Sequence, residues 1–108
     1  MECINILIAN KIMKAANFRT WLENQKYDDD TVDSRMSNCR NVEKYYSLDK
    51  QFSKDEGVSL KDKLTYSTDD ERERALQRHK VPIDGNIREG SATLKAAVKL
   101  YMEFCKEI

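Results

Sequence analysis

The chain has 108 residues, and its 19 Lys and Arg side chains balance its 19 Asp and Glu side chains, so the formal net charge at pH 7 is zero. Balanced charge excludes a global field that would draw the chain to nucleic acid or to a membrane, so any anionic partner must be met by a local patch. Three Gly and one Pro are too few for a turn-rich β-sandwich or barrel.

The first 13 residues are predicted to be an N-terminal extension. Ile4, Leu7 and Ile8 recur at helical spacing, whereas Ile4, Ile6 and Ile8 alternate as in a short strand. We expect a helix, because the segment that follows is helical and no partner strand is visible. The apolar run over 4–9 is too short to span a bilayer, so no membrane association is predicted.

Residues 14–108 are predicted to form one all-α domain, a small bundle of four to five helices. The first helix covers 14–25, where large apolar side chains recur at helical spacing. The second covers 31–46, and Asp30 is expected to be its N-cap, because its carboxylate can accept a hydrogen bond from a backbone N–H of the first turn.

The middle of the chain has shorter predicted elements. Residues 48–64 are expected to form one or two short helices, with Gly57 as the break and Ser59 as a candidate cap. Thr68 and Glu71 have the spacing of a capping box, which opens a polar surface helix over 69–78.

A loop is predicted over 79–90, with a turn at the Asp-Gly pair of residues 84–85. A short hairpin at this pair stays open as an alternative. The last helix then follows over 91–105, and Ser91 is expected to be its N-cap.

The apolar residues of this last helix form one broad stripe, because they recur at spacings of three and four: Leu94, Ala97, Val98, Tyr101, Phe104 and Cys105. A stripe of this width must be covered, and we expect the helix over 31–46 to lie against it. The side chains expected at the centre of the core are Trp21, Leu22, Val32, Met36, Leu94, Val98 and Tyr101.

Cysteine usage argues against a disulfide framework. Cys3, Cys39 and Cys105 are an odd number, widely spaced, with no C-x-x-C pair that would indicate a zinc site. We interpret Cys39 and Cys105 as small hydrophobic core residues and expect a reducing, cytoplasmic location.

Catalytic motifs are not found in the sequence. The single histidine, His79, stands between Arg78 and Lys80 without a carboxylate at a motif spacing, and we interpret it as a surface residue. The three consecutive acids at 28–30 lack the ligand spacing of an EF-hand and are interpreted as a helix cap. No phosphate-binding Gly-rich loop is present. We therefore predict that the domain is not an enzyme and holds no metal or cofactor.

Basic and amide side chains indicate a different function. The helix over 31–46 carries Arg35, Asn38, Arg40 and Lys44, while Lys95 and Lys99 share one face of the last helix. If the two helices pack side by side, these six side chains gather into one positive surface that suits DNA phosphates and base edges. A solvated face of mixed charge is the alternative reading.

Two stretches of the sequence are similar to one protein family. The first, over 18–35, has the pattern F-x-x-W-L, a short acidic linker and then D-T-V-x-x-R; the second, over 91–104, has the pattern S-x-T-L-x-x-x-V-x-x-Y-x-x-F. Both resemble the N-terminal core-binding domain of tyrosine recombinases, the phage integrases. The resemblance implies a SAM-like helical bundle that clamps one side of duplex DNA, with contacts from Arg35, Asn38, Arg40, Lys95 and Lys99. The catalytic domain of that family is missing, so strand cleavage is not implied.

A protein-interaction domain is the alternative function. Zero net charge, the polar helix over 69–78 and the apolar N-terminus favour an accessory of a phage or mobile-element protein. In this interpretation Ile4, Leu7 and Ile8 dock on a protein partner or on a second copy of the chain.

Overall fold

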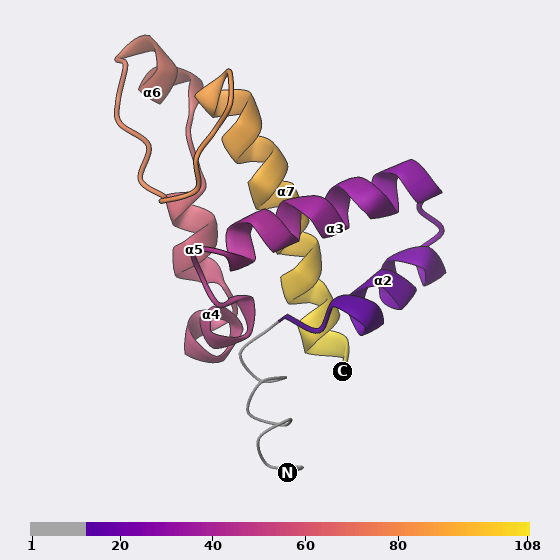
Figure 1. The fold of residues 1–108 in the computed structure, drawn as a ribbon. Helices are drawn as coiled ribbons and strands as arrows, with labels where there is room; N and C mark the ends of the chain where they lie inside the picture. The colour runs from indigo at the N-terminus through magenta and orange to yellow at the C-terminus, as the bar shows by residue number, and fades with distance from the viewer. Residues whose placement is uncertain (1–12) are drawn as a thin grey trace.

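A computed structural model of the chain describes residues 13–108; the predicted N-terminal helix, with Ile4, Leu7 and Ile8, lies outside the described residues. All regular elements of the described part are helical and none is a strand, so the predicted all-α bundle is confirmed (Figure 1). In that part of the chain, no helix combines the length and the apolar character that crossing a membrane requires.

The described helices follow one another with short connections, except for the long loop before the last. They are α2 (Ala15–Asn24), α3 (Asp29–Glu43), α4 (Leu48–Asp55), α5 (Val58–Lys63), α6 (Thr68–Arg72) and α7 (Ile87–Glu107).

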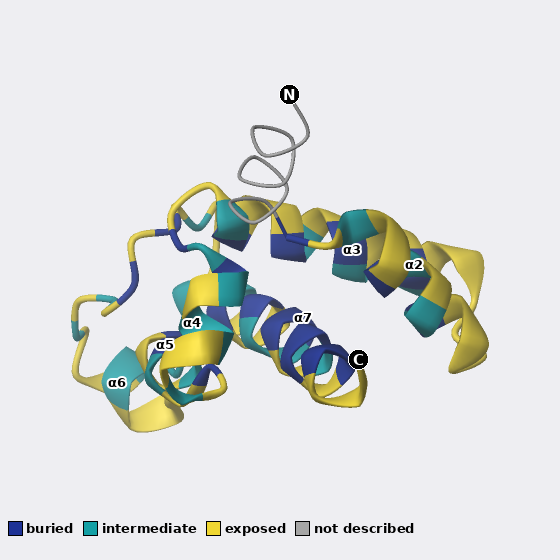
Figure 2. Ribbon diagram, turned by 90° about the horizontal axis from the view of Figure 1, so that it is seen from below, coloured by how far each residue is buried: buried dark blue, intermediate teal, exposed yellow. Residues whose placement is uncertain are grey.

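The last helix, α7, is the axis of the bundle. Helices α2 and α3 lie across one side of it, and α4 and α5 lie beside another, as Figures 1 and 2 show. The contact between α3 and α7 is the largest between any two described helices, which confirms the predicted pairing of these segments. Buried residues of α7 face the α2–α3 pair and also the α4–α5 pair, so each pair of helices covers part of the apolar stripe of α7 (Figure 2).

Four aromatic rings hold α2 against the C-terminal half of α7. Phe18 meets Tyr101 edge to face, with ring centroids 5.0 Å apart, and Phe104 lies 5.5 Å from both rings. Trp21 packs at the edge of this cluster and is only half-buried; its indole N–H donates to Glu107 Oε2 at 2.7 Å. Of the seven predicted central residues, the other six are buried as expected.

Helix α3 begins two residues earlier than predicted. The cap is Asp28, whose Oδ1 accepts the Thr31 N–H at 2.7 Å, and not Asp30, which lies inside the first turn. That hydrogen bond lowers the pKa of the Asp28 carboxyl. The helix also ends early, at Glu43, because Ser47 opens α4 as a new N-cap.

The short middle helices differ from the prediction in their caps. Gly57 separates α4 from α5 as expected, and its backbone is in the left-handed region at φ 81°. Ser59, in contrast, is not a cap: it lies in the first turn of α5, and its N–H donates to Asp55 Oδ2 at 3.1 Å. The capping box belongs to Ser67 and Asp70, one residue before the predicted pair.

The polar helix predicted over 69–78 is one turn long. It ends at Arg72 because Arg74 turns into the left-handed region at φ 55°, and the Ala75 N–H then donates to the Asp70 carbonyl at 2.9 Å. This closure satisfies the last carbonyl groups of the helix and sends the chain into the long loop.

Helix α7 begins at Ile87, four residues before the predicted start. Asn86 is its N-cap, with Oδ1 accepting the Glu89 N–H at 2.9 Å. Gly90 and Ser91 are therefore inside the helix. A Cβ at Gly90 would lie 2.5 Å from Ile83 Cγ2, so this glycine permits the loop to approach the helix closely.

His79 is buried, in contrast to the surface position predicted for it. Its side chain lies in the core with 4% exposure, and its Nε2 is 2.8 Å from Ser91 Oγ. Nδ1 accepts the Val81 N–H at 3.2 Å, which leaves Nε2 to carry the proton and donate to the serine. His79 points inward while its two basic neighbours in the sequence, Arg78 and Lys80, are exposed, so a run of basic residues contains one buried ring.

Burial of His79 predicts a loss of stability in mild acid. Desolvation lowers the pKa of the folded imidazole below its ordinary value of 6.5, so the unfolded chain binds the proton more readily. The free energy of unfolding should fall as pH drops below about 6.5, with a limiting slope of about 1.4 kcal/mol per pH unit. Urea unfolding curves across this range measure the slope.

The matched control for this prediction is His79→Asn, which removes the chain's only imidazole. Burial raises the pKa of the Glu43 carboxyl, and this group changes stability in the opposite direction, so the difference between the two proteins isolates the histidine. Equal pH dependence in both proteins would contradict the buried, neutral ring.

Candidate functional site

Two of the predicted DNA-binding residues share a hollow between α3 and α7. Arg35 and Asn38 line it from α3, and Thr93 lines it from α7, around a volume of about 420 Å³. Asp28 and Asp30 line the same hollow. Two carboxylates beside one guanidinium make this hollow unfavourable for phosphate groups.

Lys95 and Lys99 lie in a different hollow, on the side of α7 that faces α5. This second hollow, also about 420 Å³, is lined in addition by Lys61 of α5. Lys95 Nζ donates to Thr65 Oγ1 at 2.7 Å, which fixes the ammonium group at the edge of the hollow. We name this feature the lysine hollow; its lining is Val58, Lys61, Asp62, Thr65, Lys95 and Lys99.

The geometry of α7 explains why the six predicted residues do not form one surface. A helix turns about 100° per residue, so Thr93 and Lys95, two positions apart, point to nearly opposite sides. Helix α3 covers the side of Thr93, and α5 lies on the side of Lys95. The contact between α3 and α7 was predicted correctly, but α3 crosses α7 on the side away from Lys95 and Lys99, so the cationic groups are separated.

Arg40 and Lys44 occupy a third position. Both are exposed, Arg40 in the last turn of α3 and Lys44 at its C-cap, and neither lines the two hollows. The structure therefore divides the predicted set into one pair beside acids, one exposed pair and one pair in the lysine hollow.

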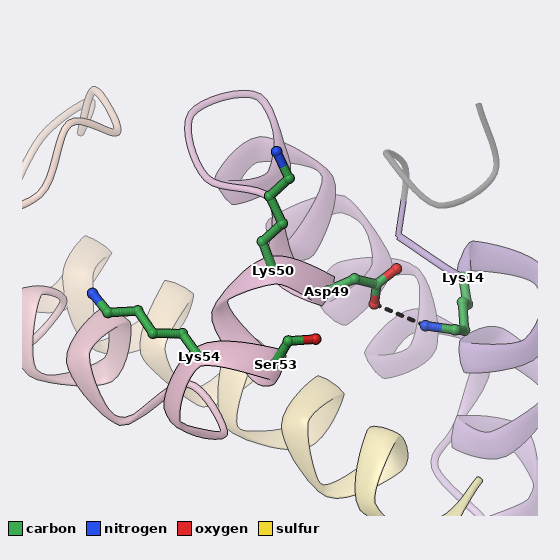
Figure 3. A pocket seen from close by; sticks show the side chains of 5 residues that line it. All are labelled: Lys14, Asp49, Lys50, Ser53 and Lys54. Carbon is green, nitrogen blue, oxygen red and sulfur yellow. Dashed lines mark ion pairs between the residues drawn. The ribbon is translucent and has the colours of Figure 1, made fainter. Parts of the chain in front are cut away.

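A third hollow of about 540 Å³ lies where α4 meets the start of α2 (Figure 3). Its carboxylate, Asp49, forms an ion pair with the Lys14 ammonium at 3.0 Å and accepts a hydrogen bond from the Tyr101 hydroxyl at 2.7 Å. Lys50 and Lys54 extend away from this ion pair (Figure 3). Because Asp49 already has two partners and the free lysines diverge, we regard this hollow as a structural contact between helices.

Burial favours the neutral forms of the thiol and phenol groups in the core. Burial raises the pKa of the Cys39 thiol to about 12, and Cys39 Sγ donates to the Ala97 carbonyl at 3.3 Å where α3 crosses α7. Burial also raises the pKa of Cys105 and of the Tyr101 hydroxyl. Neither thiol is thus a nucleophile at neutral pH, and the predicted burial of both cysteines is confirmed. Across residues 13–108, no three His, Cys, Asp or Glu side chains cluster in a way that could hold a metal ion.

Sequence reasoning missed Lys61, the third lysine of the hollow. It stands on a six-residue helix whose facing depends on how α5 packs against α7, and no local pattern carries that information.

A scan against protein-family models and searches of curated proteins and of solved structures gave no match. The resemblance to the integrase core-binding domain therefore stays a prediction from the residues that carry it.

Proposed function

We propose that this domain is a non-catalytic module that binds the phosphate backbone of duplex DNA through the lysine hollow. One observation carries the proposal: Lys61, Lys95 and Lys99 converge from two helices on one open hollow that holds a single carboxylate, Asp62. None of the three lysines forms an ion pair with another described residue, so their charge is available to an anionic ligand.

The chemistry of the hollow favours backbone contacts over base reading. Ammonium groups bind phosphates as point charges, whereas base edges are read by the planar groups of Arg, Asn and Gln. The hollow has no aromatic ring on which an unstacked base could rest, which argues against single-stranded ligands. Arg35 and Asn38 have the right groups for base edges, but they lie beside two aspartates in another hollow.

Duplex DNA binding should therefore depend steeply on salt and weakly on sequence. Three phosphate contacts predict a slope of about −2.7 in a plot of log K against log salt, which is roughly a 40-fold loss of affinity for a fourfold rise in salt. Lys99→Glu should weaken binding at least tenfold and make the slope shallower. Fluorescence anisotropy with labelled duplexes of unrelated sequences measures both quantities.

Lys44→Glu is the matched control, because it makes the same charge change at an exposed site outside the hollow. It should reduce affinity much less than Lys99→Glu, and Arg35→Glu should behave like the control. Equal losses in all three variants would indicate a diffuse charge effect and remove the proposed site. Absence of binding at low salt would remove the proposed function.

A second candidate function, protein interaction, is supported by a separate observation. Leu76 is 90% exposed, the highest value among the large hydrophobic side chains described, and it borders a hollow of about 600 Å³. An exposed apolar side chain beside an open hollow is suited to contact with an apolar protein surface, because burying it removes apolar area from water.

A further inference from the structure

The loop between α6 and α7 presents Leu76 to solvent in a fixed position. On one side of it, the Tyr66 hydroxyl donates to the Ala75 carbonyl at 2.6 Å. On the other, Gln77 Nε2 donates to the carbonyls of His79 and Val81, both at 2.9 Å. Ala75 is thus held by Tyr66 and Gln77 by its own loop, while Leu76 between them stays 90% exposed.

An open hollow adjoins this leucine. Its lining combines apolar and aromatic residues with charged and amide residues and one glycine: Tyr66, Glu71, Arg74, Ala75, Leu76, Gln77, Gly85, Ile87 and Arg88. One end is fixed by an ion pair in which Arg88 Nε lies 3.2 Å from Glu71 Oε1, and Asn86 Nδ2 donates to the other oxygen of that carboxylate at 3.1 Å. At about 600 Å³, the hollow can accept a leucine side chain with room to spare.

We propose that two copies of this chain associate through this surface, named here the Leu76 patch, each inserting its Leu76 into the hollow of the other. A two-fold interface uses the same patch on both partners, so the patch must supply the projecting group and its receptor together. Leu76 and the adjoining hollow meet this requirement, since the hollow is lined by the loop, by Tyr66 and Glu71, and by the first turn of α7.

The charges around the Leu76 patch also fit a second copy. Glu73 and Arg74 are adjacent, exposed and of opposite sign, and neither forms an ion pair with another described residue. When a mixed-sign rim meets its own copy, each charge can face an opposite one, whereas a phosphate backbone would be repelled by the acids. The patch therefore differs from the lysine hollow in both polarity and partner, and the two proposals stand independently.

An interface centred on one leucine from each copy predicts a weak, reversible dimer whose fraction rises with protein concentration. Sedimentation equilibrium over a wide concentration range tests it directly. Leu76→Ser should raise the dimer dissociation constant at least about tenfold, as expected for loss of a buried leucine contact. Because Leu76 is 90% exposed in the single chain, this change should leave the thermal midpoint of the diluted protein unaltered.

Val58→Ser is the matched control, since Val58 is also exposed, at 60%, but lies in the lysine hollow. It should leave dimerisation unchanged. Three results would overturn the proposal: a wild-type chain that is monomeric at the highest attainable concentration, a dimer that persists in Leu76→Ser, or equal weakening by both variants. Lys99→Glu lies outside the Leu76 patch and should leave dimerisation unchanged, so failure of DNA binding and failure of dimerisation are separate outcomes.

Discussion

Val98→Asp is expected to unfold the domain at room temperature. Val98 is fully buried on α7 and belongs to the hydrophobic core of the bundle. The substitution removes the burial of the valine and places an unpaired carboxylate in the core, which together cost on the order of 5 kcal/mol or more. The total free energy of unfolding for a chain of this length is roughly 5–15 kcal/mol, so little or no folded protein should remain.

Far-UV circular dichroism with thermal melting measures this outcome. Val98→Ala is the graded control, and it should keep a cooperative transition while losing about 1.5–3 kcal/mol. Lys99→Ala, at the exposed neighbouring position, should change stability by less than about 0.5 kcal/mol. A Val98→Asp protein that melts like the wild type would show that α7 does not form the centre of the core.

Phe18→Ala should destabilise the domain by about 3–5 kcal/mol, the usual cost of emptying a buried phenylalanine site. Phe18 is fully buried and contacts Tyr101 and Phe104, so its removal leaves a cavity between α2 and α7. The effect should be strongest on α2, because the Phe18 ring packs this helix against Tyr101 and Phe104 of α7.

Trp21 provides the measurement for this second substitution. It is the only tryptophan of the chain, and its fluorescence should shift towards that of a solvated indole when α2 loosens. Thr20→Ala, an exposed change on the same helix, should leave both the fluorescence and the melting temperature close to wild type. If Phe18→Ala cost less than about 1 kcal/mol, the aromatic cluster would not be what holds α2 in place.

The fold class follows from the sequence because helical periodicity is local information. Leu94, Val98 and Tyr101 recur on one face, and that face must be buried whatever else the chain does. The same reasoning identified the pairing partner, since Val32 and Met36 supply the complementary stripe on α3. These predictions needed only spacing and the free energy gained when apolar surface is buried.

Positions within the elements were harder to predict, because several residues compete for each role. Three consecutive aspartates can each cap α3, and the sequence does not say that Asp28 does so. Ser91 has the chemistry of an N-cap, yet it is buried inside α7 as the partner of His79. Both errors arise because capping depends on backbone angles that tertiary packing selects.

The candidate site needed information that no local pattern contains. Lys95 and Lys99 were identified as a pair from their spacing, but their neighbour Lys61 comes from another helix. The expected union with Arg35 and Asn38 failed because α3 covers the opposite side of α7. Which side of a helix a neighbour covers is decided by loop lengths and core packing together, and these act over the whole domain.

The thiol of Cys39 lies where α3 crosses α7, and reagents in the solvent do not reach it while the two helices are packed together. Cys39 is fully buried, hydrogen-bonded to the Ala97 carbonyl and held in its protonated form by a pKa of about 12. An alkylating reagent can reach this sulfur only during the moments when the two helices part. The rate at which Cys39 is alkylated, measured by mass spectrometry of the digested protein, therefore reports how often the centre of the domain opens.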